Sequence, residues 1–542
     1  MGRGTLHHPV SGTDERDDLV DQVEQAIELL EKLATELPKL AELDEGLRIR
    51  LVTAAGQLSR PDRYSRKALG KALLRARVKA KREADRAILD QTGIRVLRRE
   101  PVFRTPLPKP DWTALDAPLR DEEGDDAWAA AEARREGAEG AEERESETAK
   151  ARVQNARMCY VCKREFHELH FFYDQMCPPC AELNYAKREQ TADLRGRVVL
   201  VTGARVKIGY QAAIMLLRAG AEVIVATRFP SDAARRFGRE ADASDWMRRL
   251  HVYGIDLRHT PSVELFARHV LETQSRLDGL INNACQTVRR PAGWYDHVVK
   301  DEGQAPASAF ERAVLQRNYA LLGGELEQKQ LAAGQEIQAA GLWKSAVLSQ
   351  VPLLAEDLER GNHLYPQGRL DQDLQQVDMR DFNTWRMTLA EVPTAELLEV
   401  QLVNAVAPFV LNARLRPLLA AVPTRDSHVV NVSAMEGQFY RRWKTDKHPH
   451  TNMAKAALNM MTRTSAADYV KDGIHMNSVD TGWVTDEDPQ HHAARKQEVH
   501  GFHPPLDIVD GAARIVDPIF DGVNTGSHLW GLFLKDYKPA PW

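Results

Sequence analysis

The chain has 542 residues, of which 43% are hydrophobic and 28% charged, and its formal net charge at pH 7 is −5. These values are typical of a soluble globular protein with two to four structural units, and they favour neither acidic nor basic partners. No apolar run reaches the about 18 residues of a membrane span, and the first residues lack the apolar core of a signal peptide. We therefore expect a cytoplasmic protein that makes no membrane contact.

The first 110 residues are expected to form a helical region. Apolar residues recur at spacings of three and four from Leu19 to Leu37, so they share one helix face. Residues 60–104 are strongly basic, and we interpret them as a solvated helix face. A nucleic-acid or acidic-protein surface is the weaker alternative, because no recognisable binding module accompanies the charge. Residues 111–155, rich in Ala, Glu and Gly, predict an acidic linker or an exposed helix that buries little.

Two C-x2-C pairs, fourteen residues apart, predict a structural zinc unit over residues 156–190. Each pair can turn tightly enough to direct two thiolates at one ion, and four thiolates leave no open position for chemistry. Zinc binding would then supply folding energy to a unit with little core. Free thiols or reversible disulfides are the alternative, and His167 and His170 are expected to be ordinary surface or core histidines. The predicted ligands are Cys159, Cys162, Cys177 and Cys180.

Residues 198–218 predict the strand, glycine turn and helix of a dinucleotide-binding unit. An apolar run ends at Thr202-Gly203, and Gly209 follows just before an amphipathic stretch. This layout directs backbone N–H groups and a helix N-terminus at a dinucleotide phosphate. Further strands alternate with helical segments, which predicts an α/β fold with a doubly wound parallel Rossmann sheet covered on both faces. These strands are expected at residues 222–226, 251–255 and 279–282.

The end of the second strand bears on the choice of cofactor. An acidic residue there would accept hydrogen bonds from a ribose 2′-hydroxyl and favour NAD, but the strand ends at Thr227-Arg228. Arg228 could instead pair with a 2′-phosphate, which favours NADP. An ordinary surface arginine is the alternative, so NAD stays open.

In their order along the chain, these motifs and four later ones resemble the short-chain dehydrogenase/reductase family. TGARVKIG resembles the family's glycine turn, DL its adenine-contacting pair and INNAC its NNAG. VNAVAPFVLNARL, VVNVSAMEG, AKAALNMMTRTSAADY and GIHMNSVDTGWV resemble the segments that carry the catalytic asparagine, serine and lysine and the turn over the nicotinamide. The resemblance covers about residues 194–542 and implies a Rossmann domain at 191–542.

This resemblance implies an NAD(P)-dependent oxidoreductase that acts on a carbonyl or alcohol. The positions that it marks as catalytic, or as substitutes for a catalytic group, are Ser433, Lys455, Asn404, Thr451 and Tyr440. The implied cofactor contacts are Thr202, Gly203, Arg205, Lys207, Ile208, Gly209, Arg228, Asp256, Leu257, Asn283, Ala284, Lys455, Thr481 and Gly482.

The chain departs from the family pattern at the cofactor. The middle glycine of the turn is Lys207, which would either clash with the pyrophosphate or give it a cation. Together with Arg205, it could favour a strongly anionic ligand. The turn that is usually Pro-Gly is Thr481-Gly482, which weakens the expected nicotinamide wall without removing the turn.

It also departs at the catalytic dyad, because Thr451 stands where the family tyrosine precedes Lys455. That tyrosine transfers the substrate proton, and a threonine hydroxyl is far less acidic and too short to replace it. Tyr440 begins a second Tyr-x3-Lys match, which we interpret as a loop coincidence unless it folds back as a substitute acid. His448 and His450 could also move a proton, or they are ordinary loop histidines.

The register of the catalytic serine is open by one residue, because the family usually carries serine at the position of Ala434, and Ser433 precedes it. An insertion is also predicted at residues 287–392, because Asn283 and Asn404 lie 121 positions apart, far more than in the family. It leaves the sheet at its ligand-binding edge, so it could be a lid, a pocket wall or an oligomer contact. The residues to test first are Trp294, Tyr295, Trp385 and Arg386, with plain packing as the alternative.

Three functions stay open from the sequence. The first is an NADP-preferring oxidoreductase with an altered proton-transfer arrangement, acting on a small molecule that the sequence does not identify. The second is a catalytically degenerate nucleotide-binding scaffold or regulatory protein, which the missing tyrosine supports. The third, suggested only by Arg205 and Lys207, is another reaction on a nucleotide-like anion. Family members pair through the helices that hold Asn404 and Lys455, so a homo-oligomer is expected.

Overall fold

The computed structural model describes residues 14–107, 151–326, 339–342, 344–359, 361–440, 444–485 and 487–542. The chain divides into two compact units, Met1–Ala84 and Asp85–Trp542. Most of the predicted acidic segment, 111–155, lies outside the described residues. The division falls before the boundary expected near residue 110, so the last part of the basic segment belongs to the second unit.

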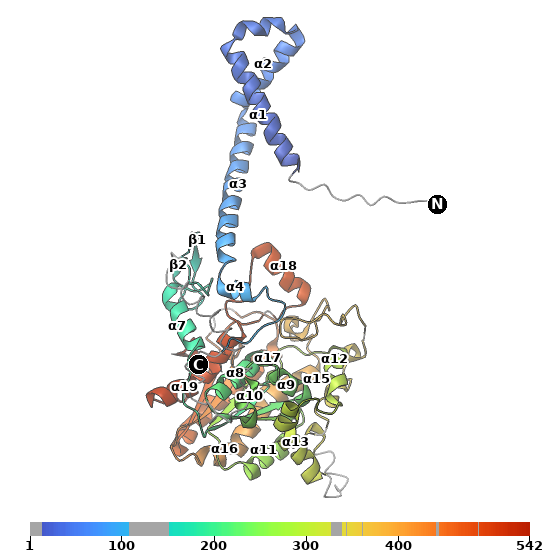
Figure 1. The fold of residues 1–542 in the computed structure, drawn as a ribbon, viewed down its shortest axis with the longest axis vertical. Coiled ribbons are helices and arrows are strands. Elements are labelled where there is room, and N and C mark those ends of the chain that lie inside the picture. The colour runs from blue at the N-terminus through green and yellow to red at the C-terminus, as the bar shows by residue number, and fades with distance from the viewer. Residues whose placement is uncertain are drawn as a thin grey trace, which may run out of the picture. The chain divides into compact units, whose positions relative to one another are not determined.

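The described part of the first unit consists of helices (Figure 1). Its basic helix begins after Asp62, whose carboxylate accepts the backbone N–H groups of Tyr64 and Ser65 and so caps the first turn. Leu19 and the other apolar residues of the first helix are largely exposed, so the predicted apolar face exists but is not buried within this unit. The elements are α1 (Asp14–Thr35), η1 (Leu37–Glu42), α2 (Glu45–Ser59) and the larger part of α3 (Arg63–Leu89).

The second unit contains an eight-stranded sheet in the order β10-β9-β8-β7-β6-β3-β4-β5. Neighbouring strands are parallel except for the last hairpin, which is antiparallel. The four strands expected from the sequence are confirmed to within one residue at either end. The strands are β3 (Val198–Thr202), β4 (Glu222–Thr227), β5 (Leu250–Gly254), β6 (Gly279–Asn282), β7 (Ser427–Ser433), β8 (Ile474–Asp480), β9 (Phe533–Lys535) and β10 (Lys538–Ala540).

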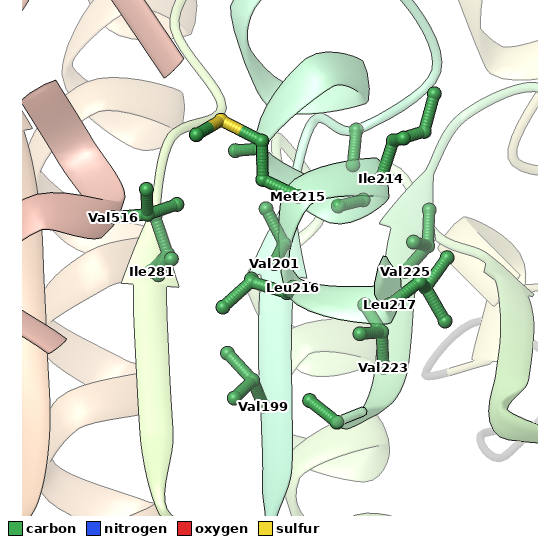
Figure 2. Close-up of a cluster of buried hydrophobic side chains, with 14 of the residues drawn as sticks. Val199, Val201, Ile214, Met215, Leu216, Leu217, Val223, Val225, Ile281 and Val516 are labelled. Carbon is green, nitrogen blue, oxygen red and sulfur yellow. The ribbon is translucent and has the colours of Figure 1, made fainter. Parts of the chain in front are cut away.

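Helices cover both faces of this sheet, as the doubly wound prediction requires. Along β3, Val199 and Val201 contribute to one core with α8 (Lys207–Arg218) and α19 (Ile508–Thr525), as Figure 2 shows for α8. Because successive side chains of a strand point to opposite faces, Leu200 contributes to the second core. That core includes side chains of α11 (Thr260–Thr273), α16 (Ala407–Ala420) and α17 (Pro449–Tyr469).

The four-cysteine segment shares a third core with the Rossmann domain. The hairpin of β1 (Arg152–Met158) and β2 (Glu165–Glu168) and the helix α7 (Pro178–Arg188) bury Tyr173 and Met176 together with Leu506 and Ile508. The end of α3 and the short α4 (Gly93–Leu97) contribute Leu89 and Ile94 to the same core.

The segment expected as an insertion leaves the sheet after β6 and returns before β7. Its helix α13 packs against β5 and α9, next to the sheet edge. The stretch Thr394–Ala420 is the one described helix long and apolar enough to cross a membrane by length and composition. Within it, 44% of the most apolar 18-residue window is buried, and α16 covers the sheet. The elements here are η3 (Ala292–Tyr295), α12 (Asp296–Glu302), α13 (Ala309–Leu326), η4 (Val347–Gln350), η5 (Ala355–Leu358), η6 (Thr384–Arg386), α15 (Thr394–Gln401) and the π-helical turn η7 (Leu402–Val406).

The remaining helices connect the strands. They are α9 (Pro230–Phe237), α10 (Ala243–Trp246), η2 (Met247–Arg249), η8 (Met435–Gly437), η9 (Val470–Asp472) and α18 (Gln490–His500).

Candidate functional site

A cavity of about 340 Å³ lies at the carboxyl ends of the parallel strands. It is lined by the turn between Gly203 and Gly209 and by residues that follow β4, β5 and β6, among them Arg228, Asp256 and Asn283. Open parallel sheets bind ligands in this crevice, where the strand order reverses. The volume lies at the lower end of the range for ligand pockets.

The turn after β3 needs glycine at two positions, because the loop after β6 lies too close for a side chain there. Gly203 has a φ of +70°, and a Cβ atom there would lie 2.7 Å from the Cα of Ala284. A Cβ at Gly209 would lie 2.3 Å from the Nδ2 of Asn283. Asn283 in turn donates hydrogen bonds of 3.0 and 3.2 Å to the carbonyls of Thr202 and Gly203. The turn after β3 and the loop after β6 therefore hold one another in place.

Lys207 occupies the left-handed region that favours glycine, with a φ of +56°, at the first residue of α8. Burial alone would lower its pKa, but the carboxylates of Glu487, Asp373 and Asp371 outweigh burial and raise it. The ammonium therefore stays charged and faces acidic groups, of which Glu487 also lines the cavity.

Arg205 lines the cavity, but its guanidinium is already bound. It forms an ion pair of 2.6 Å with Asp232 and a hydrogen bond of 2.5 Å to the side-chain oxygen of Gln375. An ion pair therefore offsets the charge of Arg205, and nearby carboxylates offset part of the charge of Lys207, which weakens the basis for the third functional hypothesis.

Arg228 lines the cavity where the sequence placed it, after β4. Its guanidinium donates a hydrogen bond of 2.8 Å to the phenol oxygen of Tyr295 and lies over the rings of Phe229 and Tyr295. The neighbouring Asp256 is held by Arg258, which donates to both of its carboxylate oxygens. Both carboxylate oxygens of Asp256 therefore already have a hydrogen-bond partner within the protein.

The inserted segment forms part of the wall of this cavity, through Val288 and Tyr295. Trp294 is buried beside Tyr295 in a small aromatic cluster. Trp385 stacks on His448 with ring centroids 3.8 Å apart and does not line the cavity. Arg386 pairs with Asp488 at 3.3 Å.

The positions of the family asparagine and lysine are buried and do not line the cavity. Asn404, within the π-helical turn, accepts the backbone N–H of Gln286 at 2.8 Å and donates to its carbonyl at 3.1 Å. Lys455 is 4% exposed, and its ammonium donates to the carbonyl of Val432 at 2.8 Å. The loop η8 closes over this part of α17, because a Cβ at Gly437 would lie 2.6 Å from the carbonyl carbon of Lys455.

The two hydroxyl residues predicted here are also buried. The Oγ of Ser433 donates a hydrogen bond of 2.6 Å to Asn459 and does not line the cavity. Ala434, the next residue, follows the end of β7, so the position after the strand carries no hydroxyl. Thr451 is buried, and its Oγ1 has no hydrogen-bond partner among the described residues.

Of the predicted substitute acids, His450 is the one near a carboxylate, and none of the three lines the cavity. Tyr440 is 47% exposed, and its hydroxyl lies beside the sulfur of Met435. His448 is held against Trp385, and burial lowers its pKa to about 4. His450 is buried directly before Thr451, and its Nε2 lies 3.5 Å from a carboxylate oxygen of Glu396.

The turn expected over the nicotinamide contacts the cysteine unit. Gly482 has a φ of +74°, and a Cβ there would lie 3.1 Å from the phenol oxygen of Tyr160, which stands between two of the cysteines. Neither Thr481 nor Gly482 lines the cavity. Tyr295 lines the cavity, as one of the insertion residues that the sequence marked for testing. The sequence did not indicate Tyr160, Glu396 or Glu487, because each lies on an element distant in sequence from the motifs.

The four cysteines converge as the two C-x2-C pairs predict. Their sulfur atoms lie within 4.8 Å of one another, and those of Cys162 and Cys177 are 3.6 Å apart. Sulfur atoms bound tetrahedrally to one Zn²⁺ at about 2.3 Å have a similar separation, so the residues fit a closed structural site. His167 and His170 instead form hydrogen bonds within the unit. The Nδ1 of His167 lies at hydrogen-bond distance from the carbonyl oxygen of Val153, and the Nδ1 of His170 accepts the backbone N–H of Phe172.

Two family models match the chain: one described as short chain dehydrogenase at residues 197–300, and one described as Enoyl-(Acyl carrier protein) reductase at residues 379–503. The uncharacterized protein R665 of Acanthamoeba polyphaga mimivirus is 30% identical over 393 residues, which cover 70% of this chain and 74% of the viral protein.

Shorter matches are to proteins of cellular organisms. Dehydrogenase/reductase SDR family member 13 of Bos taurus is 37% identical over 21% of this chain and 29% of that protein. Retinol dehydrogenase 13 of Homo sapiens is 32% identical over 17% of this chain and 28% of that protein. Among solved structures, the NADP complex of Pseudomonas aeruginosa RhlG aligns with a TM-score of 0.39 and 17% identity, over 63% of this chain and 95% of that one.

Proposed function

Because the chain belongs to the short-chain dehydrogenase/reductase family, we propose that it binds NADP(H) in the cavity at the strand ends and acts as an oxidoreductase on a carbonyl or alcohol substrate. The observation that carries this proposal is the joint lining of one cavity by the glycine turn, Arg228, Asp256 and Asn283. When bound, the cofactor supplies the hydride chemistry, so the protein must orient it and provide one route for a proton.

The glycine turn supports binding of a diphosphate. Gly203 and Gly209 remove the side chains that would separate the backbone from a ligand, and α8, with 12 residues, begins at the cavity. Backbone N–H groups at a helix N-terminus favour a phosphate oxygen. Lys207 adds a cation at the same place, although Glu487 opposes part of its effect.

Arg228 supports a preference for NADP over NAD. It lines the cavity after β4, where a dinucleotide-binding fold places the adenine ribose, and its guanidinium donates to the phenol oxygen of Tyr295 in this structure, not to a carboxylate. A guanidinium can form two parallel hydrogen bonds to a phosphate, which a 2′-hydroxyl cannot match.

We assign the proton route to a group other than the family tyrosine. Thr451 stands in the position of that tyrosine, and its hydroxyl is neither acidic nor long enough for the role. His450, one residue earlier, is paired with Glu396 in the protein interior. An imidazole can pass a proton between its ring nitrogens and a neighbouring carboxylate, so this pair is the proposed substitute.

The four cysteines are proposed to bind one structural Zn²⁺. Their sulfur atoms converge within 4.8 Å, and all five cysteines of the chain are free of disulfides. The ion would hold the hairpin of β1 and β2 against the start of α7 and so stabilise the third core.

The test of the proposed function is a pair of titrations followed by a turnover assay. The purified chain is titrated with NADPH and with NADH, and the expected result is saturable binding with a lower Kd for NADPH. Oxidation of bound NADPH is then measured with a broad panel of aldehydes and ketones. Failure of both nucleotides to bind at millimolar concentration would contradict the proposal.

A second candidate is a nucleotide-binding scaffold or regulatory protein without turnover. The specific observation in its favour is that Lys455, Asn404 and Ser433 are all buried and hydrogen-bonded within the protein rather than facing the cavity. Tight NADPH binding without turnover across the panel would favour this candidate over the enzyme.

A further inference from the structure

Three histidines meet at the opposite end of the sheet from the cavity. His428 and His475 are each the second residue of a strand, β7 and β8, and they are direct partners in the parallel register. His528 follows the end of α19 and reaches the same place. The amino ends of parallel strands lie away from the edge that binds nucleotide, so this cluster is separate from the site described above.

The three imidazole rings converge on one point. Their centroids lie 5.4 Å apart for His428 and His475, 5.1 Å for His428 and His528, and 4.8 Å for His475 and His528. One ring nitrogen from each lies within 4.8 Å of those from the other two. The Nε2 of His428 and the Nδ1 of His528 are only 3.0 Å apart, close to the spacing of two nitrogen ligands on one ion at about 2.0–2.1 Å.

A neighbouring contact orients the third ring. The Nδ1 of His475 lies 3.3 Å from the carbonyl oxygen of Ser427, to which it can donate a hydrogen bond. This contact leaves the lone pair on Nε2 of the same ring. Histidines that bind metals commonly donate their other ring N–H to a backbone carbonyl or a carboxylate in this way.

Gly522 of α19 leaves room at the meeting point. A Cβ there would lie 2.5 Å from the Nδ1 of His528 and 3.0 Å from the Nε2 of His428. These are the two nitrogens that face each other, so a side chain at this helix position would occupy the space between the helix and both ligand atoms. The cluster therefore depends on a glycine within a helix, where glycine is otherwise unfavourable.

From this geometry we propose that His428, His475 and His528 form a second metal site, which binds a divalent transition-metal ion of the zinc class. Neutral imidazole suits Zn²⁺, Ni²⁺ and Cu²⁺ and suits Mg²⁺ and Ca²⁺ poorly. The carboxylate of Asp426 interacts electrostatically with His528, but it is bound by Arg197 at 2.7 Å and is not a ligand. The site joins the segment after α19 to the two strands.

The experiment compares zinc stoichiometry among variants of the full chain. The protein is stripped with a chelator, reloaded with Zn²⁺, desalted and analysed for zinc per chain. The wild type is expected to hold one equivalent more than His528→Gln, because the four cysteines are unchanged. His491→Gln is the matched control, since His491 is a half-exposed histidine outside the cluster, and its zinc content should equal that of the wild type.

Two further measurements keep the test decisive if His528→Gln folds poorly. Gly522→Ala retains all three ligands but fills the space beside them, so it should weaken zinc binding at this site at least tenfold. Co²⁺ added to the wild type should give a nitrogen-ligand absorption spectrum in addition to the thiolate charge-transfer bands of a cysteine site. Equal zinc content in wild type and His528→Gln, or a cobalt spectrum with thiolate bands alone, would overturn the proposal.

Discussion

The phenol oxygen of Tyr160 accepts a hydrogen bond of 3.0 Å from the backbone N–H of Trp483. Tyr160 stands between Cys159 and Cys162, and Trp483 directly follows the turn that the family places over the nicotinamide. Burial raises the pKa of the Tyr160 phenol, so it stays protonated at neutral pH. The cysteine unit is therefore joined to the cofactor-binding domain at a turn expected to matter for function.

This connection predicts that removal of the metal affects more than the cysteine hairpin. Cys177→Ser should lower the zinc content and the melting temperature. The third core, which contains Leu506 and Ile508, would lose the metal ion that cross-links the β1–β2 hairpin to the start of α7. Cys285→Ser is the control for both measurements, since Cys285 is exposed and lies outside the sulfur cluster. A melting temperature unchanged in Cys177→Ser would show that the unit folds without metal.

Arg228→Gln should raise the Kd for NADPH and leave that for NADH nearly unchanged. A charged hydrogen bond to a phosphate contributes about 1.5–3 kcal/mol, which corresponds to a loss of about 10- to 100-fold in affinity. The measurement is fluorescence titration with both nucleotides. Arg235→Gln serves as the control, because Arg235 is a half-buried arginine of the neighbouring helix α9 that does not line the cavity. Equal losses for both nucleotides in Arg228→Gln would assign this arginine to packing rather than to the 2′-phosphate.

The stability of the chain should depend on pH through Asp232. Burial would raise the pKa of this carboxyl, but the guanidinium groups of Arg205 and Arg236 outweigh it and lower the pKa from 3.8 to about 2. Because the folded pKa is depressed, the contribution to stability is present above pH 3.8 and is lost as the pH falls toward about 2. Its size is about 2 kcal/mol at neutral pH.

Asp232→Asn should therefore lower the free energy of unfolding by about 2 kcal/mol at pH 7, with a smaller loss near pH 3, as measured by urea denaturation. Asp193→Asn is the matched control. Its carboxyl also has a pKa lowered to about 2, through hydrogen bonds from Arg195, but both side chains are more than half exposed. A surface pair of this kind contributes about 0–1 kcal/mol, so the two variants should differ clearly at pH 7.

The fold could be predicted from the sequence further than the site could. Strands β3 to β6 are short apolar runs that end at glycine or polar residues, so they could be predicted from the local pattern. The spacing of each C-x2-C pair alone brings two thiolates together, so the cysteine site could be predicted in the same way. The partners of Arg205 could not be, because Asp232 lies 27 positions away and Gln375 lies 170 positions away. Only the folded insertion brings Gln375 to the turn, where it accepts a hydrogen bond from Arg205. The ion pair with Asp232 of α9 offsets the positive charge that the sequence suggested for an anionic ligand.

The burial of the catalytic positions was likewise beyond the sequence. Lys455 lies in a helix that the sequence predicts, but whether its ammonium faces a ligand depends on the loop after β7. That loop packs so closely on α17 that Gly437 has no room for a side chain. The three-histidine cluster has the same origin, since His428 and His475 are neighbours only through the register of two strands 47 positions apart.

The proposed proton route predicts that His450→Gln abolishes turnover while it leaves NADPH binding intact. Loss of a general acid typically lowers kcat by about 10²- to 10⁴-fold. Glutamine has nearly the volume of histidine, but its side-chain amide does not act as an acid or a base. Because His450 does not line the cavity, the Kd for NADPH should stay within a factor of two of that of the wild type.

His448→Gln is the control for this substitution, because it removes a neighbouring histidine whose pKa of about 4 leaves it neutral and whose ring only stacks on Trp385. Glu396→Gln should reproduce the loss of turnover if the pair acts together, since an amide carries no charge to attract a proton on the imidazole 3.5 Å away. Full activity of His450→Gln would assign the proton to another group and leave the imidazole with a packing role alone.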